Sequence, residues 1–421
     1  MKYIIATLGC KVNQYESEAM EQLLRARGHE RGEKGEAELV IVNSCAVTAE
    51  GERKARQTLR RLAKENPGAM LAVCGCWSQV APEAAAELGA AVIYGTGDHL
   101  GFLEAIEGEA ALRSIPDTKR FRPFEELPAG AYAGHARASL KIEDGCDNFC
   151  SYCIIPHARG RVCSLGVEKC AQAAAELAAK GYREAVITGI EIASYGKDLP
   201  GKPDLVDACE AMCAAAPSLR LHLGSLEPRC LTEEAVERLR KLNICPHFHL
   251  SLQSGCDATL KRMNRKYDTA LFYAVVERLR KAFPGCAITT DLICGFPGET
   301  EEEFEATLAF IRRCDFAAMH VFPYSVRPGT PAAKMEQLPQ KVKTERAARA
   351  IAAAEEMELA YLRAQIGRTL TVIFETERDG ISRGHSENYV EVAAEAQGLR
   401  GLVKNVKITG LNGKMLVGSV L

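Results

Sequence analysis

Residues 141–160 read KIEDGCDNFCSYCIIPHARG and place Cys146, Cys150 and Cys153 in a C-x3-C-x2-C spacing. A strand, expected over residues 138–143, directly precedes them. Thiolates are the ligands of iron–sulfur clusters, and a [4Fe-4S] cube needs four of them. Three close cysteines would leave one iron open to a non-protein ligand, as a catalytic metal site requires. The alternatives are three unrelated thiols or a zinc site, although zinc usually takes C-x2-C pairs with histidine partners.

The chain that follows alternates strands with helices. This order predicts a parallel sheet with right-handed crossovers. Six β/α units are too few for the eight-stranded barrel, so we expect an open, partial (β/α)6 barrel over residues 132–364. Active sites of such barrels lie at the carboxyl ends of the strands, where the three cysteines fall. Strands are expected at 138–143, 184–190, 219–226, 247–252, 287–295 and 319–325, with helices such as 166–181 and 232–242 between them, and a long helix at 343–367.

The first part of the chain predicts a separate, doubly wound parallel α/β domain over residues 1–130. Its strands are continuous apolar runs, which is typical of strands covered on both faces. Residues 113–135 are rich in Pro and Gly, lack periodicity and are expected to form a linker. Strands are expected at 3–8, 38–43, 69–75 and 90–99, and helices at 17–28 and 49–68.

Three cysteines of this domain, Cys10, Cys45 and Cys76, each lie just beyond a predicted parallel strand. Ligands bind at that edge of open α/β sheets, so we expect the three thiols to converge on one rim. Cys74 falls within its strand and is expected in the core. The scattered cysteines are expected to be small buried or half-buried apolar residues: Cys209, Cys213, Cys230, Cys245, Cys256, Cys286, Cys294 and Cys314.

The composition is that of a soluble globular protein, with 421 residues, 47% hydrophobic and 26% charged. The N-terminal apolar run is too short for a secretion signal, and no run reaches the roughly 18 residues of a membrane span. We therefore expect a cytoplasmic protein that does not bind membranes. In that compartment, 17 cysteines favour metal or redox chemistry over disulfides. Because the net charge is only -2, nucleic-acid binding would need local basic patches.

The last part, residues 367–421, changes to short β-runs broken by Gly and Asn. This pattern predicts a small antiparallel β-barrel, with Tyr389 available to stack on a base. Its basic residues are Arg400, Lys404, Lys407 and Lys414. A second basic stripe, at helical spacing in the first domain, is usually a solvated helix face but can contact phosphates. It consists of Arg53, Arg56, Arg60 and Lys64.

The C-x3-C-x2-C motif after the first strand of a partial barrel resembles the radical S-adenosylmethionine enzymes. The resemblance implies that the open iron binds the amino and carboxylate groups of S-adenosylmethionine. One electron then cleaves the sulfonium to a 5′-deoxyadenosyl radical. Tyr152 matches the aromatic position that lies against the adenine in that family; a core tyrosine is the alternative.

The remaining barrel segments resemble the methylthiotransferase family. They are TGIEIASYG (188–196), GSLEP (224–228), HLSLQSGCDATLKRMNRKY (249–267), DLICGFPGETEEEF (291–304) and HVFPYSVRPGTPAA (320–333). By this analogy and their position after strands, four residues are expected to touch S-adenosylmethionine or substrate: Gly189, Glu191, Glu227 and Gln253. Glu299, in the GFPGET turn, has either a structural or a catalytic role. RGRVCSLGVEK (159–169) departs from the family pattern.

Two sets of three cysteines predict two [4Fe-4S] clusters, the second held by Cys10, Cys45 and Cys76. The family resemblance implies that S-adenosylmethionine serves as radical source and as methyl donor, and that a CH3–S group replaces C–H on the substrate. The C-terminal barrel resembles the RNA-binding TRAM domain. RNA contacts are therefore expected at Arg53, Arg56, Arg60, Lys404 and Lys407.

Three classes of methylthiotransferase differ in their substrate. LGCKVNQYES (8–17) resembles the class that modifies C2 of N6-threonylcarbamoyladenosine at tRNA position 37. The implied partners are tRNA, an electron donor such as flavodoxin or ferredoxin, and a sulfur source. The alternatives are isopentenyladenosine of tRNA and an aspartate of a ribosomal protein. A more distant alternative is a non-catalytic iron–sulfur electron carrier or RNA-binding protein.

Overall fold

The computed structural model describes residues 1–130 and 136–421. The expected boundary between the first two domains and the end of the expected linker fall on residues 131–135, outside the described part. Within the described residues, we find no helix with the length and apolar character needed to cross a membrane.

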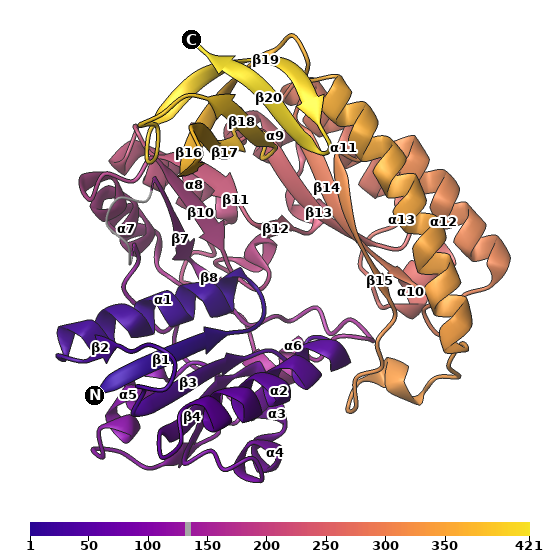
Figure 1. Cartoon of the computed structure of the whole chain (residues 1–421). Helices are drawn as coiled ribbons and strands as arrows, with labels where there is room; N and C mark the ends of the chain where they lie inside the picture. The colour runs from indigo at the N-terminus through magenta and orange to yellow at the C-terminus, as the bar shows by residue number, and fades with distance from the viewer. Residues whose placement is uncertain (131–135) are drawn as a thin grey trace.

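The N-terminal domain is a six-stranded parallel sheet with helices on both faces (Figure 1). The strand order is β2-β1-β3-β4-β5-β6. Val40 and Val42 pack toward α2, whereas Leu39 and Ile41 pack toward α1 and α5, which explains the continuous apolar run. The strands are β1 (Lys2–Thr7), β2 (Glu30–Arg31), β3 (Leu39–Ser44), β4 (Met70–Gly75), β5 (Val92–Tyr94) and β6 (Arg113–Ser114); the helices are α1 (Lys11–Ala26), α2 (Ala49–Glu65), α3 (Cys76–Val80), α4 (Pro82–Ala86) and α5 (His99–Ile106).

The central unit is the open β/α barrel that the sequence predicts. Its parallel strands form two groups, β11-β10-β7 and β12-β13-β14-β15, which separate at Gly224 between β11 and β12. The strands are β7 (Arg137–Lys141), β10 (Glu184–Thr188), β11 (Arg220–Leu223), β12 (Ser225–Leu226), β13 (His247–Gln253), β14 (Ala287–Cys294) and β15 (Ala318–Pro323). The helices are α6 (Ile155–Arg159), α7 (Val167–Ala179), α8 (Leu205–Ala215), α9 (Glu233–Leu239), α10 (Asp257–Arg262), α11 (Thr269–Ala282) and α12 (Glu301–Cys314), with 3-10 turns at Ile192–Ser194, Pro228–Cys230 and Pro331–Lys334.

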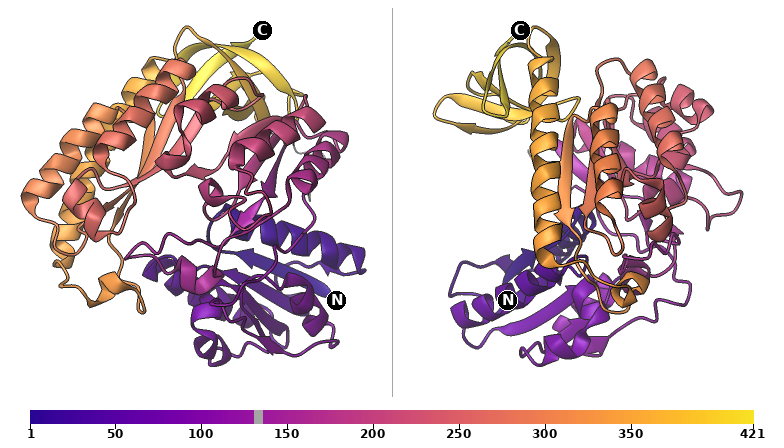
Figure 2. Two further views of the ribbon diagram at one scale, coloured as in Figure 1. Left: turned by 180° about the vertical axis from the view of Figure 1, so that it is seen from behind. Right: turned by 90° about the vertical axis from the view of Figure 1, so that its right-hand side faces the viewer.

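A closed five-stranded barrel ends the chain, in the order β16-β17-β18-β20-β19. Its pairs are antiparallel except β18 with β20, which is parallel. Helix α13 (Gln340–Arg363) runs along the central unit and leads into this barrel (Figure 2). The strands are β16 (Thr369–Arg378), β17 (Ile381–Ser386), β18 (Glu391–Glu395), β19 (Val403–Asn412) and β20 (Met415–Val420).

Strand β7 shows how the three units meet. Its first residue, Arg137, pairs with Glu375 of the C-terminal barrel at 3.0 Å. Its last residue, Lys141, pairs with Glu16 of α1 at 3.3 Å. The C-terminal barrel therefore lies at the amino ends of the central strands, and the N-terminal domain lies at their carboxyl ends, where barrel active sites form.

Several local features differ from the sequence expectations. Four two-residue strands were not expected: β2, β6, β8 (Glu143–Asp144) and β9 (Cys163–Ser164). Helix α1 begins at Lys11 rather than at residue 17, so Cys10 sits at its amino end.

Candidate functional site

The three N-terminal cysteines follow three neighbouring parallel strands. Cys10 lies between β1 and α1, Cys45 follows β3, and Cys76 opens α3 after β4. Because β1, β3 and β4 are adjacent, their carboxyl ends meet at one edge of the sheet. Burial raises the pKa of the Cys76 thiol to about 12, and the nearby thiols of Cys45 and Cys10 contribute to that rise. The structure thus brings together the three thiols that follow these strands.

The loops that carry Cys10 and Cys45 close directly against each other. Gly9 has φ +128°, and a Cβ at this position would lie 2.6 Å from Asn13 Oδ1 and 3.1 Å from Cys45 Cβ, so only glycine fits. Buried Asn13 accepts a hydrogen bond from Cys10 Sγ at 3.4 Å and donates Nδ2 to Asn43 Oδ1 at 2.8 Å. These contacts fix the thiol of Cys10 relative to the next strand.

Cys74 and Cys76 lie in different surroundings. Cys74 belongs to the hydrophobic core between the sheet and helices α1 and α5, which also contains Ile41. Cys76 belongs to the core on the other face and contacts the Arg159 guanidinium. The separation agrees with the expectation that Cys74 is a core residue.

The second set, Cys146, Cys150 and Cys153, lies in the loop between β8 and α6. Burial raises the pKa of the Cys146 thiol, and the neighbouring thiols of Cys153 and Cys150 raise it further. The turn depends on Phe149, with φ 47°, and on Gly145, whose Cβ would lie 2.0 Å from a backbone carbonyl. A tight, strained loop therefore gathers these thiols at the carboxyl end of the first barrel strand.

The spacing within each set is wider than a single zinc ion requires. A tetrahedral zinc ion, with Zn–S bonds of about 2.3 Å, needs sulfur atoms only about 3.8 Å apart. Over residues 1–130 and 136–421, neither cysteine set brings three ligand atoms within 4.8 Å of one another. A cubane cluster binds each thiolate at a different iron and so spreads its ligands more widely. Cys150 and Cys153 also border a cavity of about 390 Å³, lined by Phe149, Cys150, Cys153, His157, Gly329, Pro331 and Lys334.

Two buried carboxylates lie close to the second cysteine set. Burial raises the pKa of Glu191 to about 7, and nearby Glu227 contributes to the rise. Glu191 also raises the pKa values of Cys146 and Cys153, after burial itself. Its Oε1 is buried without a partner among the described residues. Glu227 pairs with Arg229. An unpaired, buried carboxyl next to the thiols is a position where a cationic group could bind.

The other residues expected near S-adenosylmethionine also lie around this rim. Gly189 directly follows β10 and lies so close to β8 that a Cβ would be 2.6 Å from Glu143 Oε2. Gln253 ends β13 after a break in register, with φ 67°. The ring of Tyr152 packs edge-on against Phe296, with centroids 6.4 Å apart. Tyr152 is thus both beside the cysteines and against a small apolar cluster, which fits a cofactor contact and a core tyrosine alike.

The expected RNA contacts fall on two distant surfaces. On α2, Arg53 and Arg60 are exposed, whereas Arg56 is half-buried and pairs with Glu52 at 3.3 Å. On β19, Lys404 and Lys407 are exposed. Helix α2 and strand β19 lie at opposite ends of the molecule (Figure 1).

The ring of Tyr389, which was expected to stack on a base, is 36% exposed but already has several ring and cation neighbours. Its ring stacks on His385, with centroids 4.9 Å apart and planes at 20°. His222 and His247 of the central unit pack against it, and Lys11 of the N-terminal domain lies 5.5 Å from its centroid. The ring thus contacts residues of all three units.

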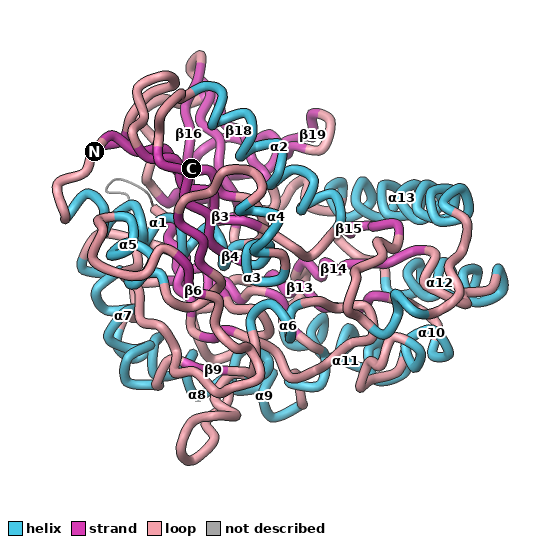
Figure 3. Tube along the Cα trace, turned by 90° about the horizontal axis from the view of Figure 1, so that it is seen from below, coloured by secondary structure: helices cyan, strands magenta, loops and turns pink. Residues whose placement is uncertain are grey.

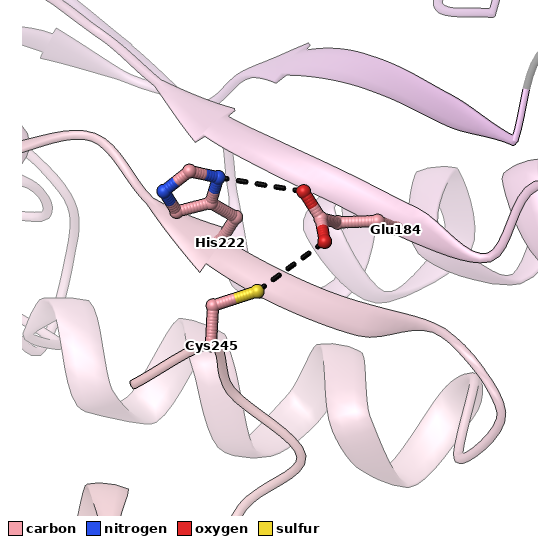
Figure 4. A group of neighbouring side chains, drawn as sticks. All are labelled: Glu184, His222 and Cys245. Carbon is pink, nitrogen blue, oxygen red and sulfur yellow. Dashed lines mark hydrogen bonds and ion pairs between the residues drawn. The ribbon is translucent and has the colours of Figure 1, made fainter. Parts of the chain in front are cut away.

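A further polar cluster fills the amino end of the barrel strands (Figure 4). Glu184, His222 and Cys245 bring an oxygen, a nitrogen and a sulfur within 4.8 Å of one another. Glu184 also pairs with Arg137 at 2.8 Å and Arg220 at 2.7 Å. Because two guanidinium groups already neutralise this carboxylate, they would repel a metal cation. We therefore regard the cluster as part of the barrel's packing.

Sequence reasoning missed two arginines that contact the cysteines. Arg159 donates its Nε–H to Cys76 Sγ at 3.3 Å, and Arg265 donates to Cys150 Sγ at 3.3 Å. Arg265 lies in the barrel-rim segment 249–267, and Arg159 closes the cysteine motif itself. Both positions were visible in the sequence, but the partners they reach were not.

The fold and these two cysteine sites define a radical S-adenosylmethionine enzyme, a class that uses S-adenosylmethionine and a [4Fe-4S] cluster. The profile of the Radical SAM superfamily matches residues 140–311, and that of the uncharacterized protein family UPF0004 matches residues 2–95. More narrowly, the chain belongs to the family of radical S-adenosylmethionine methylthiotransferases, as its relatives show.

The relatives match nearly the whole chain. The threonylcarbamoyladenosine tRNA methylthiotransferase MtaB of Bacillus subtilis is 39% identical over 96% of this chain and 92% of its own. The MtaB of Thermotoga maritima is 37% identical over 92% of this chain and 90% of its own. A tRNA-2-methylthio-N(6)-dimethylallyladenosine synthase of Pelotomaculum thermopropionicum is 32% identical over 99% of this chain and 97% of its own.

A solved structure supports the fold. The radical S-adenosylmethionine methyltransferase TsrM from Kitasatospora setae superposes with a TM-score of 0.54 at 16% identity, over 79% of this chain and 75% of that one.

Proposed function

We propose that this protein is a tRNA methylthiotransferase that places a methylthio group at C2 of N6-threonylcarbamoyladenosine at tRNA position 37. The observation that carries the proposal is the pair of three-thiol sites, one at the rim of each α/β unit. The substrate follows from the names of the 39% and 37% identical relatives. The proposed enzyme has three domains: the N-terminal α/β domain (residues 1–130), the partial barrel (132–364) and the C-terminal β-barrel (367–421).

The two thiol sets fit two [4Fe-4S] clusters. Cys146, Cys150 and Cys153 would hold one, and the other would be held by Cys10, Cys45 and Cys76. When bound, the first cluster supplies the electron that cleaves S-adenosylmethionine and the second holds the sulfur that is transferred. Each set leaves one coordination position without a cysteine, which suits these two roles.

The carboxylates at the rim would orient the cofactor. S-adenosylmethionine carries a sulfonium and an ammonium group, both cationic. Glu191 and Glu227 lie beside the second cysteine set, and a bound cation would restore the ionised form of Glu191. Gly189 and Gln253 shape the same rim, and the Tyr152 ring offers the adenine an apolar contact.

A large nucleic acid fits the distribution of basic residues. Arg53, Arg56 and Arg60 lie on the N-terminal domain, while Lys404 and Lys407 lie on the C-terminal barrel at the other end of the molecule. A substrate that neutralises both surfaces must span the central unit, as a folded tRNA can. The reaction also requires an electron donor such as flavodoxin or ferredoxin and a sulfur source. Substrate and donors would place the protein in the cytoplasm.

The dimethylallyladenosine class is the second candidate, because a relative with that name is 32% identical over 99% of the chain. The discriminating residues are Lys11, Val12 and Asn13, beside the Cys10 thiol. In the structure, Asn13 supports the thiol loop and Lys11 turns toward the barrel base.

Mass spectrometry of tRNA nucleosides from cells lacking this gene would test the proposal. We expect N6-threonylcarbamoyladenosine to accumulate while its 2-methylthio form disappears. If the 2-methylthio form of dimethylallyladenosine (isopentenyladenosine) disappeared instead, the result would support the second class. A mass change confined to a ribosomal protein would contradict both.

A further inference from the structure

Arg159 is a fully buried cation at the end of α6, six residues after Cys153. Its terminal nitrogens contact both oxygens of Glu16, at 2.7 and 3.1 Å, and the carboxylate of Asp144, at 3.1 Å. The remaining donor, Nε–H, lies 3.3 Å from Cys76 Sγ. An arginine this deep is tolerated because two carboxylates compensate its charge.

The contact joins the two thiol sites. Helix α6 continues the loop that carries the Cys146 set, and α3 begins at Cys76 of the other set. The two short helices pack side by side (Figure 3). Arg159 therefore reaches from the polypeptide segment of one site to a thiol of the other.

The carboxylates hold the guanidinium in one orientation. Because Glu16 and Asp144 engage its terminal nitrogens, the planar group can present only Nε–H to the sulfur. Glu16 belongs to the N-terminal domain and Asp144 to the central unit, so the donor is fixed relative to both. Such a charge-assisted hydrogen bond is stronger than one between neutral groups.

A donor in this position acts on any iron–sulfur cluster bound through Cys76. Reduction adds an electron and makes the cluster more negative. A cationic N–H next to a ligand sulfur stabilises the reduced form more than the oxidised form, and hydrogen bonds to sulfur are an established control of cluster potential. The expected effect is a higher reduction potential.

We propose that Arg159 is a positioning residue of the N-terminal cluster, which tunes that cluster's reduction potential through Cys76 and ties its site to the radical S-adenosylmethionine loop. This inference rests on the proposed second cluster. The competing account gives Arg159 only a structural role, as an ion pair that docks the two units.

The test isolates the N-terminal cluster in the full-length chain. A background with Cys146→Ala, Cys150→Ala and Cys153→Ala removes the other cluster, and the midpoint potential of the remaining one is measured by potentiometric EPR titration. In this background, Arg159→Gln should shift the potential to a more negative value. Arg159→Lys keeps a positive charge between Glu16 and Asp144 but loses the Nε–H, and should give a smaller shift in the same direction.

Arg122→Gln is the matched control. Arg122 pairs with Asp144 at 3.2 Å and donates to the Arg159 carbonyl, but makes no contact with Cys76 among the described residues. It should leave the potential unchanged. Pulsed EPR on the same triple-alanine background, labelled with 15N-arginine, should show a nitrogen coupling that Arg159→Lys removes; the background also lacks Cys150, the thiol that Arg265 contacts.

The outcomes separate the two proposals. A background protein that binds no cluster overturns the second cluster itself. A bound cluster with the same potential in the Arg159→Lys variant, and no arginine nitrogen coupling, overturns the role of Arg159 and leaves a purely structural ion pair.

Discussion

The backbone N–H of Glu191, three residues beyond the end of β10, donates to Oε2 of Glu143, the first residue of β8, at 2.7 Å. Burial raises the pKa of the Glu143 carboxyl well above its ordinary value and so favours its neutral form. The contact anchors segment 188–196 to the strand that precedes the cysteine loop. One hydrogen bond thus couples the S-adenosylmethionine candidates to the cysteine site.

The Glu143 contact predicts different effects for two substitutions. Glu143→Gln keeps a neutral acceptor of similar shape and should change the Kd for S-adenosylmethionine by less than about threefold. Glu143→Ala leaves the Glu191 N–H without its acceptor, at a cost of about 1–3 kcal/mol, and should weaken binding about tenfold or more. Isothermal titration of the cluster-loaded enzyme measures both. Equal affinities for the Gln and Ala variants would contradict this role.

The cysteine assignment predicts the iron content of two neighbouring variants. Cys76→Ala should remove about half of the iron, because one of the two proposed clusters loses a ligand. Cys74→Ala, its matched control in the strand interior, should retain the full iron content. Iron and labile sulfide analysis after anaerobic reconstitution measures both. The reverse pattern would make Cys74 the ligand.

Buried Glu16 predicts a dependence of stability on pH. Burial alone would raise its pKa, but Arg159, Lys141 and His99 outweigh burial and lower the pKa from 4.5 to about 2. The stabilisation is therefore complete above pH 4.5 and is lost as the pH falls toward about 2. A shift of this size corresponds to a contribution on the order of 3 kcal/mol.

Glu16→Gln should lower the melting temperature at neutral pH and flatten its decline on acidification, which calorimetry at several pH values measures. Glu50→Gln is the control, since the pairs that Glu50 forms with Arg53 and Lys54 on α2 are exposed. If the two variants had the same pH profile, the buried network would not carry this linkage.

The exposed lysines of β19 predict a change in the salt dependence of tRNA binding. Lys404→Ala with Lys407→Ala should reduce affinity and lower the slope of log K against log salt by about 1 for each phosphate that a lysine no longer neutralises. Lys414→Ala should have little effect, because Glu358 already pairs with Lys414 at 2.6 Å. Filter binding over a range of salt concentrations tests this, and an unchanged slope in the double variant would remove β19 from the interface.

The overall architecture was predictable because local patterns carry it. Alternating strands and helices indicated both α/β units, and cysteines just past three adjacent strands had to converge on one edge. The expectation for the scattered cysteines also holds, since Cys209, Cys245, Cys286, Cys294 and Cys314 are buried and Cys213, Cys230 and Cys256 half-buried. In contrast, the two-residue strands have no periodicity and exist only through their pairing partners.

The contacts between units were not predictable. Arg159 and Glu16 are 143 positions apart in the chain, and no local pattern shows that the two domains dock through them. The neighbours of Tyr389 were unpredictable for the same reason: its ring stays 36% exposed, but docking places His222, His247 and Lys11 beside it.

The measurement that tests the central claim most directly uses the purified, reconstituted protein under anaerobic conditions, with reductant, sulfide, S-adenosylmethionine and a tRNA that carries N6-threonylcarbamoyladenosine at position 37. Nucleoside mass spectrometry should show the 2-methylthio form of that nucleoside together with 5′-deoxyadenosine. The same tRNA without the threonylcarbamoyl group should remain unmodified. Formation of 5′-deoxyadenosine with no methylthio product, although both clusters are present, would contradict the account.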